Sequence, residues 1–342
     1  MKYLVNIIIY IIFIIILFYF INYFLKPKEH MTMKNQRLNK IFNDNGYNID
    51  INNYSINKND TVIKEYSTGN FNTLEAHKTA KNKPMTNTIF AENNIPVPKH
   101  AIIDNVNKFK YINNIIPIEF PCVLKPVDGM QGKDVNTFIK NKDQYNNILE
   151  NLLNKYDKVM MENQVYGDNY RIFVFNNEIM DVIKREQPFI VGDGTKDVET
   201  LIIEKNNKQK EKHLFPTKNI DYNFIKEQGY DKNSIVDKNK KIFITNTINF
   251  HNGANPVRID LNSIPQKNKD IFIKAHKLIK LDCSGIDYMS NDITVPYDEN
   301  KGHIIEINDM VDTKIHIDAD NQSQPDFLFQ NIYKSFINNI KN

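Results

Sequence analysis

Glu162-Asn-Gln-Val-Tyr-Gly167-Asp-Asn-Tyr-Arg171 is the stretch of sequence that decides the fold. It lies between two strand-like runs, at residues 158–162 and 171–175, and leaves a glutamate at the end of one and an arginine at the start of the other. Further strand-like runs at 120–125 and 178–184 surround a helical stretch at 143–155. Strands that alternate with a helix in this way predict an α+β fold.

The rest of the chain adds helices and strands on either side of this centre. A helix is predicted at 85–93, because Ile95-Pro-Val-Pro98 cannot continue it and instead starts an extended segment. Towards the C-terminus the sequence predicts a helix at 267–280, strands at 285–289 and 303–307, and a closing amphipathic helix at 326–340. Short β-like pieces occur between residues 30 and 70, including one at 61–66.

Composition excludes several classes of protein. The 342 residues, of which 41% are hydrophobic and 25% charged, suffice for one compound domain or two small ones. The 44 basic and 41 acidic side chains leave a net charge of +3, which argues against a nucleic-acid partner. Cys122 and Cys283 are the only cysteines, so neither a disulfide framework nor a cysteine zinc site is expected. A reducing compartment fits this cysteine usage.

The N-terminal segment reads as a membrane anchor. Residues 3–25 are almost all apolar, and about 20 such residues span the hydrocarbon core as a helix. A cleaved signal peptide is the alternative, but no small-residue cleavage site precedes Lys26-Pro-Lys28. The excess of basic residues after the span places the following domain in the cytosol by the positive-inside rule. The predicted organisation is an anchor at 1–25, a linker or small pre-domain at 26–75, and one domain at 76–342.

A glycine-containing loop follows the predicted strand at 120–125. In Lys125-Pro-Val-Asp-Gly-Met-Gln-Gly132, a lysine stands at the end of a strand beside Gly129 and Gly132. Glycines let backbone N–H groups approach phosphate oxygens, and a lysine neutralises their charge, so the loop suits a polyphosphate. Taken alone, an ordinary strand and turn is the more common explanation of the same residues.

The last two predicted strands carry oxygen ligands. Gly285-Ile-Asp287 and Glu306-Ile-Asn308 place three such side chains on apolar strands, and the strand period of two puts Glu306 and Asn308 on one face, with Ile305 and Ile307 towards the core. Two carboxylates and an amide suit a hard divalent cation such as Mg²⁺. A solvated sheet face with ordinary polar alternation is the alternative.

Several motifs occur together in one order. Beside those quoted above, the chain contains the landmarks Lys83-Pro-Met-Thr86, Ile95-Pro-Val-Pro98, Arg185-Glu186, Gly192-Asp-Gly194, Asn249 with Gly253, and His316. From about residue 76 to 326 this set resembles the ATP-grasp domain of cyanophycin synthetase. It resembles more distantly the ribosomal-protein glutamate ligases and the ATP-grasp part of bifunctional glutathione synthetases. The resemblance implies an ATP-grasp fold, in which two α+β subdomains grip ATP.

The resemblance also implies roles for individual residues. Lys83 and Lys125 would contact the ATP phosphates with the Gly129–Gly132 loop, and Glu162 would end the strand against which adenine binds. Arg171 would steady the transferred phosphoryl group, with Arg185 and Asn249 also in the catalytic set. Asp287, Glu306 and Asn308 would hold Mg²⁺, as two ions, with Mn²⁺ as a substitute. In the family's reaction a carboxylate becomes an acyl phosphate, and an amine then displaces the phosphate to leave an amide.

The sequence departs from these relatives on the substrate side. The Mur-ligase-like domain that follows in cyanophycin synthetase is not expected in this chain. Asn252 stands where related glutamate ligases would place an arginine, which would remove a substrate-side charge. Val311 and Asp312 fall in the place of a Pro-Gly turn, and Lys314 replaces an arginine. These changes leave the identity of the carboxylate and the amine open.

Three functions from different classes follow from these observations. The leading one is an ATP- and Mg²⁺-dependent ligase that joins an amino-acid or peptide carboxylate to an amine on the cytosolic face of a membrane. The alternative is a nucleotide-binding pseudoenzyme that acts as a membrane-tethered interaction module, and a third is a kinase-like reaction without an amine acceptor. His251, His303 and His316 are candidate bases, although an isolated histidine is more often structural. The oligomeric state, including a homo-oligomer, is left open.

Overall fold

The structure is a computed structural model of the 342-residue chain. It describes residues 48–50, 55–58 and 61–64, then residues 72–309 apart from 109–110, 112–117, 130–131 and 212–213, and finally residues 311, 315–316 and 319. The chain divides into two compact units, Met1–Tyr66 and Ser67–Asn342. The predicted division into segments 1–25, 26–75 and 76–342 stays a prediction.

The first unit contains a small antiparallel sheet. Its strands β1 (Asn48–Asp50), β2 (Ser55–Lys58) and β3 (Thr61–Lys64) pair in the order β1-β2-β3. The β-like piece predicted at 61–66 corresponds to β3. The predicted membrane span at 3–25 and the predicted helix at 326–340 lie outside the described residues. Within the described part of the chain, no helix has both the length and the apolar character that a membrane crossing requires.

A five-stranded antiparallel sheet forms the centre of the second unit. Its strands are β8 (Asp168–Phe175), β9 (Glu178–Glu186), β12 (Asn255–Arg258), β13 (Cys283–Ser290) and β14 (His303–Asn308), in the order β12-β9-β8-β13-β14. The strands predicted at 171–175, 178–184, 285–289 and 303–307 are therefore confirmed. The predicted α+β class holds for this unit.

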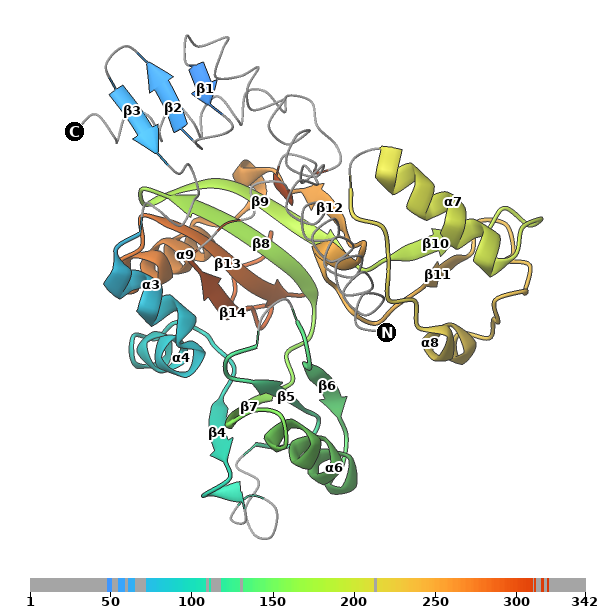
Figure 1. Ribbon diagram of the computed structural model, residues 1–342, viewed down its shortest axis with the longest axis horizontal. Helices are drawn as coiled ribbons and strands as arrows, with labels where there is room; N and C mark the ends of the chain where they lie inside the picture. The colour runs from blue at the N-terminus through green and yellow to red at the C-terminus, as the bar shows by residue number, and fades with distance from the viewer. Residues whose placement is uncertain are drawn as a thin grey trace, which may run out of the picture. The chain divides into compact units, whose positions relative to one another are not determined.

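Helices cover one face of this sheet (Figure 1). They are α3 (Leu74–Lys81), α4 (Lys83–Glu92) and α9 (Gln266–Leu278). Directly opposite residues of antiparallel strands share a face, and on this face Ile172 and Ile286 pack against Phe90 of α4 and Phe272 of α9 in one buried core. Asn82 caps α4 by accepting from the Met85 N–H, and Pro84 occupies its first turn, which explains why the helix starts earlier than predicted.

One predicted orientation in β14 is wrong. Ile307 is buried as expected, but Ile304 rather than Ile305 is its partner in the core. The pairing register shifts between Asp287 and Tyr288, so that Asp287 lies opposite Glu306 while Tyr288 lies opposite Ile304. This β-bulge adds a residue at Ile305 and breaks the period of two, while Glu306 and Asn308 beyond it still share a face.

A second sheet has its own core. Strands β4 (His100–Asp104), β5 (Cys122–Pro126), β6 (Asn136–Ile139) and β7 (Lys158–Asn163) pair in the order β4-β7-β5-β6. One face packs Leu124 and Met161 against Leu149 of α6 (Lys142–Leu153). The register places Lys125 and Glu162 on the opposite face. The strands predicted at 120–125 and 158–162 and the helix predicted at 143–155 are confirmed.

A third, smaller core was not predicted. Helices α7 (Val198–Glu211) and α8 (Tyr222–Glu227) pack with the two-stranded ribbon of β10 (Phe189–Val191) and β11 (Lys241–Phe243). The chain returns from this part through the short 3-10 helix η2 (Phe250–Asn252) to β12, and a second, η3 (Leu261–Ser263), precedes α9. Asn249 at the start of η2 is thereby carried to the edge of the five-stranded sheet.

Stability is expected to fall in mild acid because of His276. This fully buried residue of α9 contacts Ser284 Oγ through Nδ1 at 2.8 Å, and burial, with a smaller effect of Lys277, lowers its pKa to about 4. In the unfolded chain His276 would be protonated near pH 6.5, whereas in the native chain it is protonated only near pH 4. The free energy of unfolding should therefore drop by about 3 kcal/mol across this window. Urea titrations of wild type and His276→Gln at pH 7 and pH 4.5 check this, since the variant should show a flatter pH dependence; an equal slope would contradict it.

Candidate functional site

The face of the five-stranded sheet turned away from the helices carries charged side chains. Asp287 of β13 lies directly opposite Arg171 on β8 and Glu306 on β14. Asn308 lies opposite Gly285, two residues along the same face. The structure therefore places the three predicted metal ligands and one predicted catalytic arginine on one sheet face. Arg171, Asp287 and Glu306 form one cross-strand row, and Asn308 lies in the adjacent row.

Asp287 is held between two arginines. Its Oδ1 atom lies 3.2 Å from Arg171 Nη1 and 2.9 Å from Arg185 Nη2, and the three side chains are only 11–15% exposed. Neither contact has hydrogen-bond geometry, so Oδ1 is buried with charge compensation but without a hydrogen bond. Burial lowers the pKa of Arg185, and the charge of Asp287 opposes this effect. The two guanidinium groups therefore compensate the charge of Asp287 from two sides.

Gly285 provides the space in which Arg171 lies. Arg171 Nη1 donates to the Gly285 carbonyl at 3.0 Å, and Asn308 Nδ2 approaches the same oxygen at 3.5 Å. A Cβ atom on Gly285 would come within 2.7 Å of Arg171 Nη1. Glycine at this position therefore allows the guanidinium to lie over β13 beside Asp287.

Alanine at Gly285 is expected to displace Arg171 and weaken ATP binding. Because the new methyl group meets the end of a flexible side chain, the free energy of unfolding should change by less than about 1.5 kcal/mol. Loss of one charge-assisted hydrogen bond should raise the dissociation constant of Mg·ATP about 10-fold or more. Isothermal titration calorimetry measures this. Ser284→Ala, on the opposite face of the same strand, is the matched control, and equal affinity of the Gly285 variant and wild type would contradict the assignment.

Lys83 connects the glycine loop to β14. Its Nζ donates to the Gly129 carbonyl at 2.6 Å and lies 3.7 Å from Glu306 Oε1. Gly129 itself is packed closely, since a Cβ would come within 2.6 Å of the Pro126 ring. The predicted phosphate-binding residues Lys83 and Gly129 are thus next to the predicted metal ligand Glu306.

The other end of the loop approaches Asn249. Gly132 has a φ of +73°, which favours glycine, and a Cβ there would lie 3.6 Å from Asn249 Nδ2. Asn249 begins η2, and its Oδ1 accepts from the His251 N–H at 2.8 Å. The loop therefore lies between Lys83 on one side and Asn249 on the other.

Lys125 and Glu162 form a buried ion pair. Lys125 Nζ lies 2.6 Å from Glu162 Oε2, and the residues are only 8% and 3% exposed. Asn87 Nδ2 donates to the other carboxylate oxygen at 3.2 Å. His100 lies opposite Glu162, and burial lowers the pKa of this histidine. These residues form a buried part of the second sheet, and the predicted role of Glu162 beside adenine stays a prediction.

Helix α4 links the two parts of the site. It carries Lys83 at its first position and Asn87 one turn later, so one helix contacts the glycine loop through the first and Glu162 through the second. Sequence reasoning missed Asn87, because a buried amide on a helix has no distinguishing pattern. The structure shows Lys125 in contact with Glu162 rather than with the loop.

The donor set fits a magnesium ion that binds together with a nucleotide. Asp287 and Glu306 supply carboxylates and Asn308 an amide oxygen, which are hard ligands. Among the described residues, no three His, Cys, Asp or Glu side chains gather into a metal cage. Mg²⁺ is commonly held by one or two carboxylates plus phosphate oxygens, and this arrangement matches that pattern.

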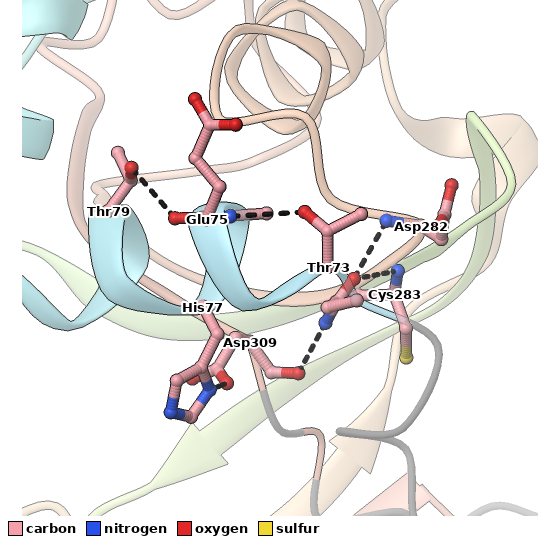
Figure 2. Close-up of polar contacts among 9 residues, drawn as sticks. Thr73, Glu75, His77, Thr79, Asp282, Cys283 and Asp309 are labelled. Atoms are coloured by element: carbon pink, nitrogen blue, oxygen red, sulfur yellow. Dashed lines mark hydrogen bonds and ion pairs between the residues drawn. The ribbon is translucent and has the colours of Figure 1, made fainter.

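Side chains from α3 and the residues before it fix the strand ends next to Asn308 (Figure 2). His77 Nδ1 contacts the carboxylate of Asp309 (Figure 2). Asn72 Nδ2 donates to the carbonyls of Cys283 and Asp309, at 2.8 and 2.7 Å, while its Oδ1 accepts from Asp282 and Cys283 N–H groups. These contacts hold the start of β13 and the end of β14 together. None of them was foreseen, since they join segments far apart in sequence.

Asn252 has a structural role. Its side chain is 7% exposed, and Oδ1 accepts from the backbone N–H groups of Lys218 and Asn219, at 3.0 and 2.9 Å. The amide thus holds the segment after α7 against η2. Two further altered positions, Asp312 and Lys314, lie outside the described residues, and Val311 is buried.

Comparisons with known proteins agree on the fold. Residues 80–193 match the family of RimK-like ATP-grasp domains. A solved bifunctional glutathione synthetase from Pasteurella multocida superposes with a TM-score of 0.58 at 20% identity, over 84% of this chain and 41% of that chain. The second unit therefore has an ATP-grasp fold.

Sequence relatives cover most of this chain but a small part of their own length. A cyanophycin synthetase of Geminocystis herdmanii is 29% identical over 259 residues, which are 72% of this chain and 29% of that protein. A glutathione biosynthesis bifunctional protein, GshAB, of Clostridium perfringens is 26% identical over 237 residues, or 67% of this chain and 30% of that protein. The chain thus spans less than a third of the curated relatives it matches. The predicted resemblance to these families is confirmed.

Proposed function

We propose that this chain, which carries an ATP-grasp domain of the RimK-like type, is an ATP- and Mg²⁺-dependent ligase that forms an amide bond between a carboxylate and an amine. The substrates are amino acids or short peptides. The similarity to cyanophycin synthetases and to a glutathione biosynthesis protein supports this class of reaction. The observation that carries the proposal is the row of Arg171, Asp287 and Glu306, which meets Lys83 and the glycine loop.

Each charged side chain has a role in this reaction. Lys83 and the backbone of the Gly129–Gly132 loop bind the phosphates of ATP, and the Lys125–Glu162 pair lies at the nucleoside end. Arg171 neutralises the transferred phosphoryl group while the substrate carboxylate attacks the γ-phosphorus and ADP leaves. Phosphoryl transfer depends on such positioning and charge neutralisation more than on a protein nucleophile. The resulting acyl phosphate then reacts with the amine.

Two Mg²⁺ ions, with Mn²⁺ as a substitute, would be held by Asp287, Glu306 and Asn308. When bound, they would supply charge neutralisation at the β- and γ-phosphates. Asp287 then has a second task, because its carboxylate keeps the two buried guanidinium groups of Arg171 and Arg185 from repelling one another. Arg185 lies close to the reacting groups because it contacts Asp287. Asn249 lies close to them because it adjoins Gly132 of the glycine loop.

The pseudoenzyme alternative is less well supported. A chain that only bound nucleotide would have no need of the Arg171–Asp287–Arg185 cluster, which costs free energy to bury. The altered position Asn252 also has a structural explanation, so its change does not by itself argue for lost activity.

We further propose that residues 3–25 anchor the enzyme to a membrane with the ATP-grasp domain on the cytosolic side, where ATP is available. The apolar run and the basic residues after it support this arrangement. Membrane fractions washed with alkaline carbonate should retain the whole chain but release a variant that lacks residues 1–25. Release of both would contradict the anchor.

The ligase proposal is tested with the whole chain in detergent micelles. The protein is mixed with Mg·ATP and pooled L-amino acids and dipeptides, and phosphate release and new amide masses are followed. Amide formation that depends on ATP, on Mg²⁺ and on Asp287 is the expected result. Binding of Mg·ATP without phosphate release in any pool would favour the pseudoenzyme, and phosphorylated products without amides would favour a kinase-like reaction.

A further inference from the structure

A second polar cluster lies on the same face of the five-stranded sheet. Asp181 of β9 is 2% exposed, and its Oδ2 lies 3.0 Å from His316 Nδ1. Its Oδ1 accepts from Arg258 Nε of β12 at 3.1 Å, and Arg258 also donates through Nη2 to the His316 carbonyl. The carboxylate thus joins a partly buried arginine and a buried histidine. The reaction proposed above uses none of the three.

The strand register places this cluster beside the reaction centre. Asp181 is opposite Phe173 on β8, and Phe173 is opposite Gly285 on β13, so these positions share the face that carries Arg171. The His316 ring packs on the Phe173 ring with 5.3 Å between centroids. Phe173 lies two residues along β8 from Arg171, whose guanidinium covers Gly285. The imidazole therefore adjoins the space next to the arginine that would hold the phosphoryl group.

One ring nitrogen of His316 lacks a hydrogen-bond partner among the described residues. The residue is 1% exposed, and among the residues that the structure describes its Nε2 has no hydrogen-bond partner. Arg258 already compensates the charge of Asp181, so a neutral imidazole that donates from Nδ1 balances the cluster. Nε2 then carries a lone pair, and a carboxylate bonded to Nδ1 fixes this tautomer. A buried, unpaired acceptor of this kind costs free energy unless a ligand uses it.

We propose that His316 is a catalytic residue of the second half-reaction, in which its Nε2 accepts a proton from the attacking amine. Asp181 and Arg258 are its positioning residues. This inference rests on the ligase function proposed above. It deepens that function, since it assigns the amine substrate to the end of the sheet face marked by Phe173 and Asp181.

In this half-reaction the amine displaces phosphate from the carbonyl carbon of the acyl phosphate. The nitrogen lone pair of the neutral amine forms a bond to the carbonyl carbon of the acyl phosphate, and the bond from that carbon to the phosphate oxygen breaks. The electron pair of the broken bond leaves with inorganic phosphate. One N–H proton moves to His316 Nε2, and the imidazolium then gives it to the departing phosphate or to water. Asp181 stabilises the transient positive charge.

If the role of this cluster were purely structural, apolar residues would be expected in its place. An ion pair and a histidine sealed in a core are often less stabilising than apolar residues of the same volume, so a buried group with an unpaired nitrogen gains nothing from packing alone. The apolar neighbours Ile183, Phe250 and Ile315 on this face show that hydrophobic packing is available here.

The tautomer of His316 gives the first test, which does not depend on knowing the substrates. The whole chain is labelled with ¹⁵N-histidine, and His316→Asn identifies the signal of this residue among the eight histidines. A long-range ¹H–¹⁵N spectrum at pH 7.5 should show Nδ1 protonated and Nε2 unprotonated. Protonation of Nε2 at this pH would overturn the proposal.

The second test separates the two half-reactions. Asparagine at position 316 places an amide donor near the position of Nδ1 and keeps the contact with Asp181, but it provides no base. Hydroxylamine, a neutral nucleophile that needs no base, traps the acyl phosphate as a hydroxamate. With Mg·ATP and pooled L-amino acids and dipeptides, His316→Asn should form hydroxamate at a rate within about 3-fold of wild type. Its amide formation should fall about 100-fold, by the usual size of general-base catalysis.

A control variant and the wild type separate the role of His316 from the ligase function. His303→Asn, a histidine on β14 outside the cluster, should leave both rates unchanged. Equal loss of both rates, or loss of neither, would overturn the role of His316. If wild type forms neither hydroxamate nor amide, the ligase function itself fails, and the role assigned to His316 fails with it.

Discussion

Replacement of Lys125 by methionine is expected to cost both stability and ATP affinity. Glu162 would keep its negative charge at a position that is 3% exposed, without its lysine partner and with the hydrogen bond from the Asn87 amide remaining. Breaking a buried ion pair by removing one member typically costs about 3–5 kcal/mol, and the free energy of unfolding should fall by this amount. The dissociation constant of Mg·ATP should rise about 10-fold to 100-fold, as expected for the loss of a charged contact.

The double variant Lys125→Met/Glu162→Gln separates the two effects. Glutamine removes the uncompensated charge and can still accept from Asn87, so most of the lost stability should return. ATP affinity should stay low, because the cation remains absent. Urea titration and calorimetry with Mg·ATP measure the two quantities. A Lys125→Met chain that binds ATP as tightly as wild type would contradict the role of this lysine.

Replacement of Asp287 by asparagine should have the largest effect on turnover. Asparagine has nearly the same shape, yet it removes both a proposed metal ligand and the carboxylate that pairs with Arg171 and with Arg185. Two adjacent guanidinium groups without that charge should lower the free energy of unfolding by about 2–4 kcal/mol. Amide formation should fall at least about 1000-fold, because phosphoryl transfer depends on charge neutralisation.

Glu306→Gln is the matched control for this prediction. Glu306 is the other carboxylate of the donor set, but its side chain is 30% exposed and its ion pair with Lys83 spans 3.7 Å. Its loss should leave stability within about 1 kcal/mol of wild type and still raise the Mg²⁺ concentration needed for half-maximal turnover. Equal stability losses in both variants, or an unchanged Mg²⁺ requirement, would contradict the roles given to these residues.

The long apolar strands were predictable from the sequence, and the smaller parts of the fold were not. Strands β5, β7, β8, β13 and β14 are apolar runs with clear ends. The ribbon of β10 and β11 has strands of three residues within polar surroundings, and it becomes regular only when α7 packs on it. The bulge at Ile305 was missed for a related reason, since strand periodicity assumes an unbroken ladder.

The site residues were predictable one by one, but their partners were not. The motifs pointed to Arg171 and Asp287 separately, whereas their ion pair follows from the register between β8 and β13. Asn87 and Asp181 stand in no motif and were found only through their contacts with Glu162 and His316. The sequence favoured a structural role for His316, and its unpaired Nε2 became visible only once the chain was folded.

An oxygen-transfer measurement tests the central claim most directly. Pooled amino acids and dipeptides, labelled with ¹⁸O in their carboxylates, are incubated with the whole chain and Mg·ATP, and the inorganic phosphate released is analysed by mass spectrometry. An acyl-phosphate route moves one carboxylate oxygen into the phosphate, so the account predicts one ¹⁸O atom in phosphate for each amide formed, and none with Asp287→Asn. Unlabelled phosphate released together with amide would contradict it.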